Sequence, residues 1–264
     1  MALKLRDIDE TQAPLLDHLI ELRTRLVRCV IALAIAFAVC LYFADDIFGF
    51  LVRPLTVAFA EGNQQGRLIY TQLYEAFFVE LKVALFAAFF VSFPIIANQL
   101  WAFVAPGLYA KEKSAFLPFL IATPILFTAG ASLAYFVVMP TAFIFFLDFE
   151  GMSGGLAQEA LPAMGEYLAL VMQFILAFGI SFLLPVLLLL LNKAGIVSRA
   201  QLISARRYVI VLVVAVAAVV TPPDPGSQLV LAIPLMLLFE GSLALMWFGE
   251  RRLKKAEAKQ VADS

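Results

Sequence analysis

Six long apolar stretches occupy most of this chain, and they constrain its fold more than any other feature of the sequence. They extend over residues 26–44, 77–104, 115–146, 167–191, 209–220 and 229–248. A helix needs about 20 apolar residues to cross the hydrocarbon core of a bilayer. Because a backbone in hydrocarbon must satisfy its own hydrogen bonds, only helices and closed barrels span membranes. We therefore predict an all-α membrane protein with six transmembrane helices.

The basic residues between the apolar stretches fall on alternate connections, which predicts an orientation. The positive-inside rule assigns the Lys- and Arg-rich segments to the cytoplasm. Both termini and the second and fourth connections are rich in basic residues, and the first and third connections contain only Arg53 and Arg67. We therefore expect a multi-pass membrane protein with both termini in the cytoplasm.

The composition agrees with a single membrane domain. Hydrophobic residues make up 63% of the sequence and charged residues 15%, unlike a soluble domain. We expect one six-helix domain over residues 1–264, with a basic cytoplasmic tail at 249–264. The mixed charges of the first two dozen residues do not resemble a cleavable signal peptide. Cys29 and Cys40 are eleven positions apart, about 16 Å along one helix, which is too far for a disulfide.

Prolines predict the shape of the helices and of two connections. The fifth connection contains Pro222, Pro223, Asp224 and Pro225, so we expect a sharp external reversal. The apolar runs beside it, 209–220 and 229–239, would each extend only about 18 Å against a core of about 30 Å, which predicts short fifth and sixth spans. Either the bilayer thins locally there or the flanking polar residues snorkel to the interface. In the first external connection, Pro54 and the residues after it predict a short amphipathic segment and a turn. Prolines inside the spans predict kinked helices and a concave body: Pro94, Pro118, Pro124, Pro140, Pro185 and Pro234.

The inventory of reactive side chains argues against an enzyme. Ser153 lies in a Gly-x-Ser-x-Gly pattern, but a serine nucleophile needs a base within about 3 Å. The one histidine, His18, is predicted on the opposite side of the membrane. No His, Cys and Glu cluster has metal-ligand spacing and no phosphate-binding glycine loop is present, so we expect neither a metal nor a cofactor. Glu80 and Lys82 are equally consistent with interfacial anchors and with a functional pair.

A polar cluster precedes the first span. Residues 15–26 place four leucines on one helical stripe, so Glu21 faces elsewhere, next to Arg23 and Arg25. The residues alone allow two interpretations, a binding site at the membrane surface or an anchoring helix with internal charge pairs.

The sequence of this segment resembles that of a known protein family. His18-Leu19-Ile20-Glu21-Leu22-Arg23 is similar to the start of TatC, the multispanning core of the twin-arginine protein translocase. The similarity continues in order along the chain through four further motifs: 101–109 with Lys111-Glu112, 134–140 with Phe143, 178–182 before Pro185, and 221–224 with Ser227-Gln228.

The resemblance implies a receptor in the bacterial inner membrane that binds twin-arginine signal peptides of folded proteins. It implies that this receptor works with the single-span subunits TatA and TatB, and that the proton motive force drives export of the folded proteins. It implies a cytoplasmic signal-peptide site formed by Glu21, Leu22, Arg23, Phe103 and Glu112. Carboxylates suit this role, because a guanidinium binds a carboxylate in bidentate fashion and stays charged. The resemblance implies that the protein makes and breaks no bond. It implies membrane lipids and other copies of the chain as partners, and it does not imply nucleic acid.

The resemblance also assigns the last hairpin. Thr221 and Gln228 are similar to positions that contact TatB or TatA, and polar side chains can hydrogen-bond a partner helix in hydrocarbon. Ordinary capping of the hairpin is the competing account, and Pro222 and Asp224 could simply stabilise the reversal. Leu183 departs from the family, which often has Glu or Gln there. Gln173, on the same predicted helix, could supply some polarity in its place.

Two other classes of protein stay open from the residues. A small-molecule or ion transporter would need polar groups converging at mid-membrane, where this sequence is almost uniformly apolar. A structural membrane scaffold is compatible with the composition, but it would not need Glu21 or Glu112.

Overall fold

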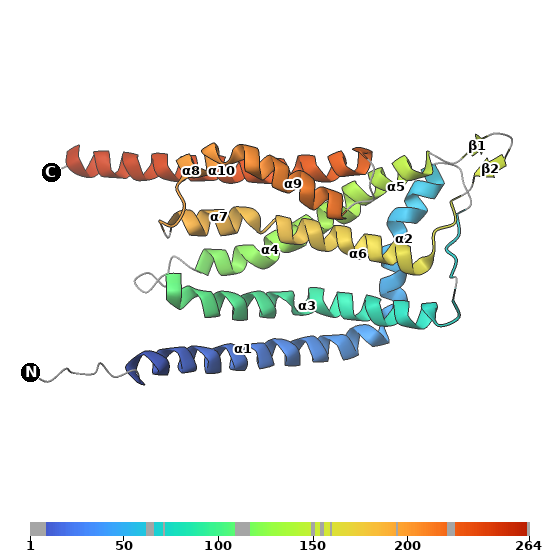
Figure 1. Ribbon diagram of the computed structural model, residues 1–264, viewed down its shortest axis with the longest axis horizontal. Helices are drawn as coiled ribbons and strands as arrows, with labels where there is room; N and C mark the ends of the chain where they lie inside the picture. Colours follow the sequence, from blue (N-terminus) through green and yellow to red (C-terminus); the bar gives the residue numbers. More distant parts are fainter. Residues whose placement is uncertain are drawn as a thin grey trace, which may run out of the picture.

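The computed structural model describes residues 9–61, 66–70, 72–108, 117–148, 151–153, 156–158, 160–193, 195–220 and 225–262. These residues form a helical bundle in which α1 begins and α10 ends at the same end of the molecule (Figure 1). The helices are α1 (Asp9–Tyr42), α2 (Ala44–Glu61), α3 (Glu75–Leu108), α4 (Leu117–Leu133), the π-helical turn η2 (Ala134–Val138), α5 (Met139–Leu147), α6 (Met164–Ser181), α7 (Leu184–Lys193), α8 (Arg199–Ser204), α9 (Arg206–Val220) and α10 (Pro225–Ala262).

Five helical segments of the described chain are long and apolar enough to cross a membrane. They are His18–Tyr42, Glu75–Phe103, Phe119–Leu147, Met164–Lys193 and Gln228–Arg251. These segments correspond to five of the six predicted spans. The fifth predicted span is α9, whose 15 residues rise about 22 Å and are shorter than the others.

The expected short sixth span is wrong. Glu240 does not interrupt the last helix, because α10 continues through it as one helix of 38 residues. Its apolar segment, Gln228–Arg251, has 24 residues and is long enough for a full crossing. Any thinning of the bilayer therefore depends on α9 alone, and it stays a prediction.

Two of the predicted proline kinks have a clear cause in the structure. Pro140 has no N–H to donate to the carbonyl of Phe136, and the chain widens into η2 just before it. There the N–H of Met139 donates to the carbonyl of Ala134, five residues back. Pro185 likewise follows a break at Phe182 and Leu183 that divides α6 from α7.

The first connection contains a helix of 18 residues, α2, which agrees with the expected amphipathic segment. Pro54 lies inside this helix and is buried, so its assignment to a turn or hairpin is corrected. The buried face of α2 includes Leu51, Leu55 and Phe59, which pack into the main core with residues of α3, α5 and α6. Burying that face fixes α2 against the bundle.

Small residues bring α1 and α3 together. Ala36, Cys40 and Ala44 pack on Ala84 and Ala88, both of which are 0% exposed. Small side chains let membrane helices approach closely, where dispersion contacts replace the hydrophobic effect. Cys40 is therefore a packing residue.

Large apolar side chains cover much of the outer surface. On α1 these include Leu19, Leu22 and Leu26, which are 59%, 42% and 60% exposed. The predicted leucine stripe of α1 thus faces away from the protein. Such a surface suits contact with lipid rather than water.

A short hairpin lies at the opposite end of the bundle from the start of α1 (Figure 1), and its two strands of three residues each leave the predicted all-α class in place. It pairs β1 (Gly151–Ser153) with β2 (Leu156–Gln158) in antiparallel register. Ile69 anchors the neighbouring loop, because its N–H donates to Pro162 and its carbonyl accepts from Met164. Ser153 is in β1 and His18 is in α1, so the structure separates the two residues of the rejected hydrolase site.

Candidate functional site

Three side chains on α1 form a connected polar group. His18, Glu21 and Arg25 are spaced at i, i+3 and i+7, which places them on one face of a helix. Arg25 donates to Oε1 of Glu21 from Nε at 2.9 Å and from Nη2 at 2.6 Å. Nδ1 of His18 lies 3.8 Å from Oε2 of Glu21. The internal charge pairing that the sequence left open is therefore present between Glu21 and Arg25.

Helix α3 completes this group through Phe103 and Gln99. The imidazole of His18 stacks on the ring of Phe103, with centroids 4.2 Å apart and an angle of 15° between the planes. Nη1 of Arg25 reaches Oε1 of Gln99 at 3.5 Å, at the limit of a hydrogen bond. Gln99 and Phe103 are one turn apart, so the same face of α3 supplies both contacts.

The site is partly open. The side chain of Glu21 is 36% exposed and that of Arg25 is 21% exposed. Leu22 and Arg23 are exposed beside them on the following positions of α1. The structure therefore brings Glu21 and Phe103 together through His18, and it leaves Leu22 and Arg23 at the rim. Glu112 lies outside the described residues.

Arg25 and Gln99 belong to the site, although neither was predicted as a site residue. The spacing of Glu21 and Arg25, four residues apart with the acid first, is the favourable order for a helical ion pair. That signal was available. Gln99 could not be found in this way, because its contact with Arg25 joins two helices 74 residues apart.

The chemistry of the group is that of an acceptor for cations. A carboxylate offers about four lone-pair sites, and Arg25 uses those of one oxygen. A guanidinium or ammonium ion from outside can bind the remaining sites or displace Arg25. No group of three or more potential metal-ligating side chains occurs in the described parts of the chain.

Of the second predicted set, the structure describes only Gln228, which lies on α10. Nε2 of Gln228 donates to the carbonyl of Val214 at 3.2 Å, which joins the start of α10 to α9. Gln173 on α6 makes a similar contact with the carbonyl of Val219 at 2.9 Å. Thr221, Pro222 and Asp224 lie outside the described residues.

Leu183 occupies the break between α6 and α7. It is half-buried and packs against an apolar cluster that contains Phe93, Ala97 and Phe127. An acidic side chain at this position would meet apolar neighbours. The apolar side chain of Leu183 therefore fits its surroundings.

The long apolar helices and the lipid-suited surface define a polytopic integral membrane protein. Comparison with known sequences places it more narrowly. Residues 17–234 match the model of the family described as Sec-independent protein translocase protein (TatC). The chain belongs to this family, which is a component of a protein translocase.

Bacterial relatives match over nearly the whole chain. A TatC protein of Magnetococcus marinus is 49% identical over 253 residues, covering 96% of this chain and 89% of the relative. A TatC protein of Escherichia coli is 39% identical over 236 residues, covering 88% and 87%. A crystal structure of the twin-arginine translocase receptor TatC superimposes with a TM-score of 0.76 at 38% identity, covering 86% of this chain and 98% of that one. The predicted family is confirmed.

Proposed function

We propose that this chain is the receptor subunit of a twin-arginine translocase and that it binds twin-arginine signal peptides next to Glu21. The proposal depends on one observation, the half-exposed Glu21 carboxylate that Arg25 holds beside the stacked rings of His18 and Phe103. A peptide guanidinium can form the same charge-assisted hydrogen bonds as Arg25. Arg25 thus acts as an internal competitor that keeps the carboxylate paired when no peptide is bound.

We assign Leu22, Arg23 and Glu112 to the same site. Leu22 is 42% exposed and can pack on apolar residues of a signal peptide. Glu112 follows α3 in sequence, and it would supply a second carboxylate for the second arginine. Two arginines then meet two acids, which gives more specificity than one ion pair.

We assign the outer end of α9 and α10 to partner subunits. Thr221 and Gln228 would contact the single helices of TatA and TatB. The amide of Gln228 has further donor and acceptor sites beyond its contact with Val214. Pro222 and Asp224 would shape the connection between the two helices. In hydrocarbon such polar contacts are a main source of helix association.

We infer the membrane topology and the assembly of the chain from the distribution of its basic residues and from its family. The single domain would have six spans, both termini in the cytoplasm and the signal-peptide site at the cytoplasmic face. Several copies of the chain would assemble with TatA and TatB, and the proton motive force would drive export of the folded cargo. The chain itself would bind and organise rather than catalyse.

The test is the affinity of a fluorescent twin-arginine signal peptide for the purified full chain in detergent. We expect Glu21→Gln to weaken binding by about tenfold or more, because a hydrogen bond to a charged group contributes about 1.5–3 kcal/mol. The same peptide with two lysines should bind weakly to the native chain and to Glu21→Gln alike.

Glu250→Gln is the matched control. Glu250 also pairs with an arginine, Arg199 at 3.0 Å, and has a similar exposure. It should bind the twin-arginine peptide with native affinity. Native affinity in Glu21→Gln, or an equal loss in both variants, would overturn the proposal. Photo-crosslinking from Phe103 would then report whether the peptide binds elsewhere.

A further inference from the structure

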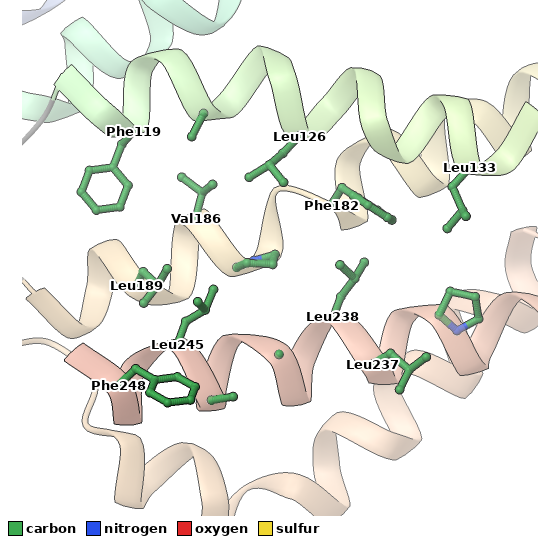
Figure 2. A pocket seen from close by; sticks show the side chains of 15 residues that line it. Phe119, Leu126, Leu133, Phe182, Val186, Leu189, Leu237, Leu238, Leu245 and Phe248 are labelled. Carbon is green, nitrogen blue, oxygen red and sulfur yellow. The ribbon is translucent and has the colours of Figure 1, made fainter. Parts of the chain in front are cut away.

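A long apolar groove runs between α4, α7 and α10. Figure 2 shows side chains from these helices that converge on one space, with a volume of about 720 Å³. All of the side chains that line it are apolar, apart from Gly241, which has none. The walls include Leu126, Val186, Leu189, Leu238, Leu245 and Phe248. This volume is within the range of about 300–1,000 Å³ for small-molecule sites.

The length of the groove suits a hydrocarbon chain. On α4 it extends from Phe119 to Leu133, and on α10 from Pro234 to Phe248. Each stretch covers 14 steps of a helix, a rise of about 21 Å. One leaflet supplies about half of the 30 Å hydrocarbon core. The groove is therefore long enough to hold an acyl chain from one leaflet over the whole length of that chain.

Two cations lie at the Phe119 end of the groove. Lys193 follows the wall residue Leu189 by one turn of α7, and its Nζ lies 5.3 Å from the ring centroid of Phe119. Arg251 follows the wall residue Phe248 by one turn of α10, and its guanidinium lies 3.6 Å from the ring centroid of Trp247. Within the part of the chain that the structure describes, neither cation forms a salt bridge with an acid.

We propose that the groove is a binding site for an anionic phospholipid. One acyl chain fills the space between α4, α7 and α10, and the headgroup phosphate lies between Lys193 and Arg251. The arrangement combines an apolar volume in the hydrocarbon with positive charge at the depth of the headgroups. Basic residues at such positions attract anionic lipids. The site is separate from the Glu21 site and does not depend on the proposed signal-peptide binding.

A partner helix fits the same groove less well. Helices associate in membranes through small residues and interhelical hydrogen bonds. Gly241 and Ala244 are small, but the rest of the wall presents mostly branched and aromatic side chains, and no lining side chain carries a hydrogen-bonding group. A flexible acyl chain can follow such an irregular surface, and it needs no hydrogen bonds.

Native mass spectrometry of the full chain in detergent tests the proposal with two added lipids. Phosphatidylglycerol and phosphatidylcholine with identical acyl chains would fill the groove equally well, and they differ in the net charge of the headgroup. We expect phosphatidylglycerol to bind more tightly. The double variant Lys193→Gln, Arg251→Gln should lose that preference, because each cation increases the affinity for an anionic lipid about fivefold. Equal binding of the two lipids to the native chain would overturn the proposal.

A pair of glycine variants tests the groove itself. A Cβ added at Gly241 meets no atom within 4 Å, so Gly241→Leu fills the groove without disturbing the fold. Gly249 lies on the same helix, has equally open surroundings and does not line the groove. Gly241→Leu should reduce the binding of both lipids, and Gly249→Leu should bind them as the native chain does. Native binding by Gly241→Leu would contradict the proposed location.

Photolabelling in membranes distinguishes a lipid from a partner helix. Phosphatidylglycerol with a diazirine in its acyl chain should label peptides of α4, α7 and α10 in the native chain, and these labels should disappear in Gly241→Leu. If the lipid does not label these helices, and a photoreactive side chain at Leu237 instead captures a single-span protein, the groove is a protein interface and the proposal is wrong.

Discussion

The hydroxyl of Tyr135 donates a 2.6 Å hydrogen bond to the carbonyl of Phe50, which Pro54 leaves without its helical donor. In a regular helix the N–H of residue 54 would bind that carbonyl, and proline has no N–H. The rings of Phe50 and Tyr135 also stack, with centroids 4.4 Å apart. Tyr135 thus compensates for a proline inside α2 from the π-helical turn η2, 85 residues away in sequence.

A double-mutant cycle tests this compensation. Tyr135→Phe leaves the partly buried carbonyl of Phe50 without a donor, and we expect it to reduce the free energy of unfolding by about 0.5–1.5 kcal/mol. In a Pro54→Ala background the new N–H can bind Phe50, so the same change should cost less. Chemical unfolding in detergent measures both. Equal costs in the two backgrounds would contradict the compensation. Tyr42→Phe is the control, because Tyr42 is 85% exposed and should change stability little.

Close contact between α4 and α6 predicts a sharp effect of one methyl group. A Cβ added at Gly130 would lie 2.5 Å from the carbonyl oxygen of Phe178 and 2.7 Å from the ring of Phe182. Backbone atoms on a packed helix cannot move aside cheaply, so Gly130→Ala should destabilise the chain by about 1–3 kcal/mol.

Gly49→Ala is the matched control for that change. Gly49 lies on α2, and a Cβ there meets no atom within 4 Å. This variant should be neutral or gain up to about 1 kcal/mol from helix propensity. Thermal unfolding of the two variants side by side gives the comparison. A stable Gly130→Ala would show that α4 and α6 can separate without loss.

The apolar helices and their order could be predicted from sequence, because hydrophobicity over 20 or more residues is a local property. The length of the last helix could not be predicted from sequence. Glu240 looks like an interruption of the apolar run, yet it lies inside α10, where its Oε2 accepts from Nη2 of Arg206 at 2.7 Å. The partner is on α9, 34 residues away. Sequence alone does not indicate that pairing.

In the candidate site, too, contacts within one helix could be predicted from sequence and contacts between helices could not. Glu21 and Phe103 were found by their resemblance to a family, and the structure adds the link between them. His18 connects them by stacking on Phe103 and lying near Glu21. Contacts within α1, such as Glu21 with Arg25, follow from helical spacing. Contacts between α1 and α3 depend on how the two helices pack, and the small residues that set this packing carry little sequence signal.

The ion pair between Arg206 and Glu240 gives a third prediction. Removing Arg206 alone leaves a carboxylate on a helix that lies in or near hydrocarbon, where an unpaired charge is costly. We expect Arg206→Ala to be more destabilising than Arg206→Ala combined with Glu240→Ala. The coupling should be on the order of 1 kcal/mol, since both side chains keep more than 40% exposure. Additive effects in an unfolding cycle would mean that the pair contributes nothing.

The stack of His18 on Phe103 gives the last prediction, which separates two roles of the histidine. The stacked rings of His18 and Phe103 hold α1 against α3. Nδ1 of His18 lies near Glu21 and can contribute a positive charge when the imidazole is protonated. His18→Phe keeps an aromatic face and removes the nitrogen. His18→Ala removes both.

If packing is the main role, His18→Phe should bind a twin-arginine signal peptide with nearly native affinity. His18→Ala should bind it several-fold more weakly, because an aromatic pair contributes about 0.5–1.5 kcal/mol beyond its buried area. Phe103→Ala should match His18→Ala, since each removes one partner of the same stack. Titration of the fluorescent peptide against the three variants gives the answer. Equal losses in His18→Phe and His18→Ala would assign the effect to the imidazole nitrogen beside Glu21, and the peptide site would then depend on charge rather than on how α1 packs against α3.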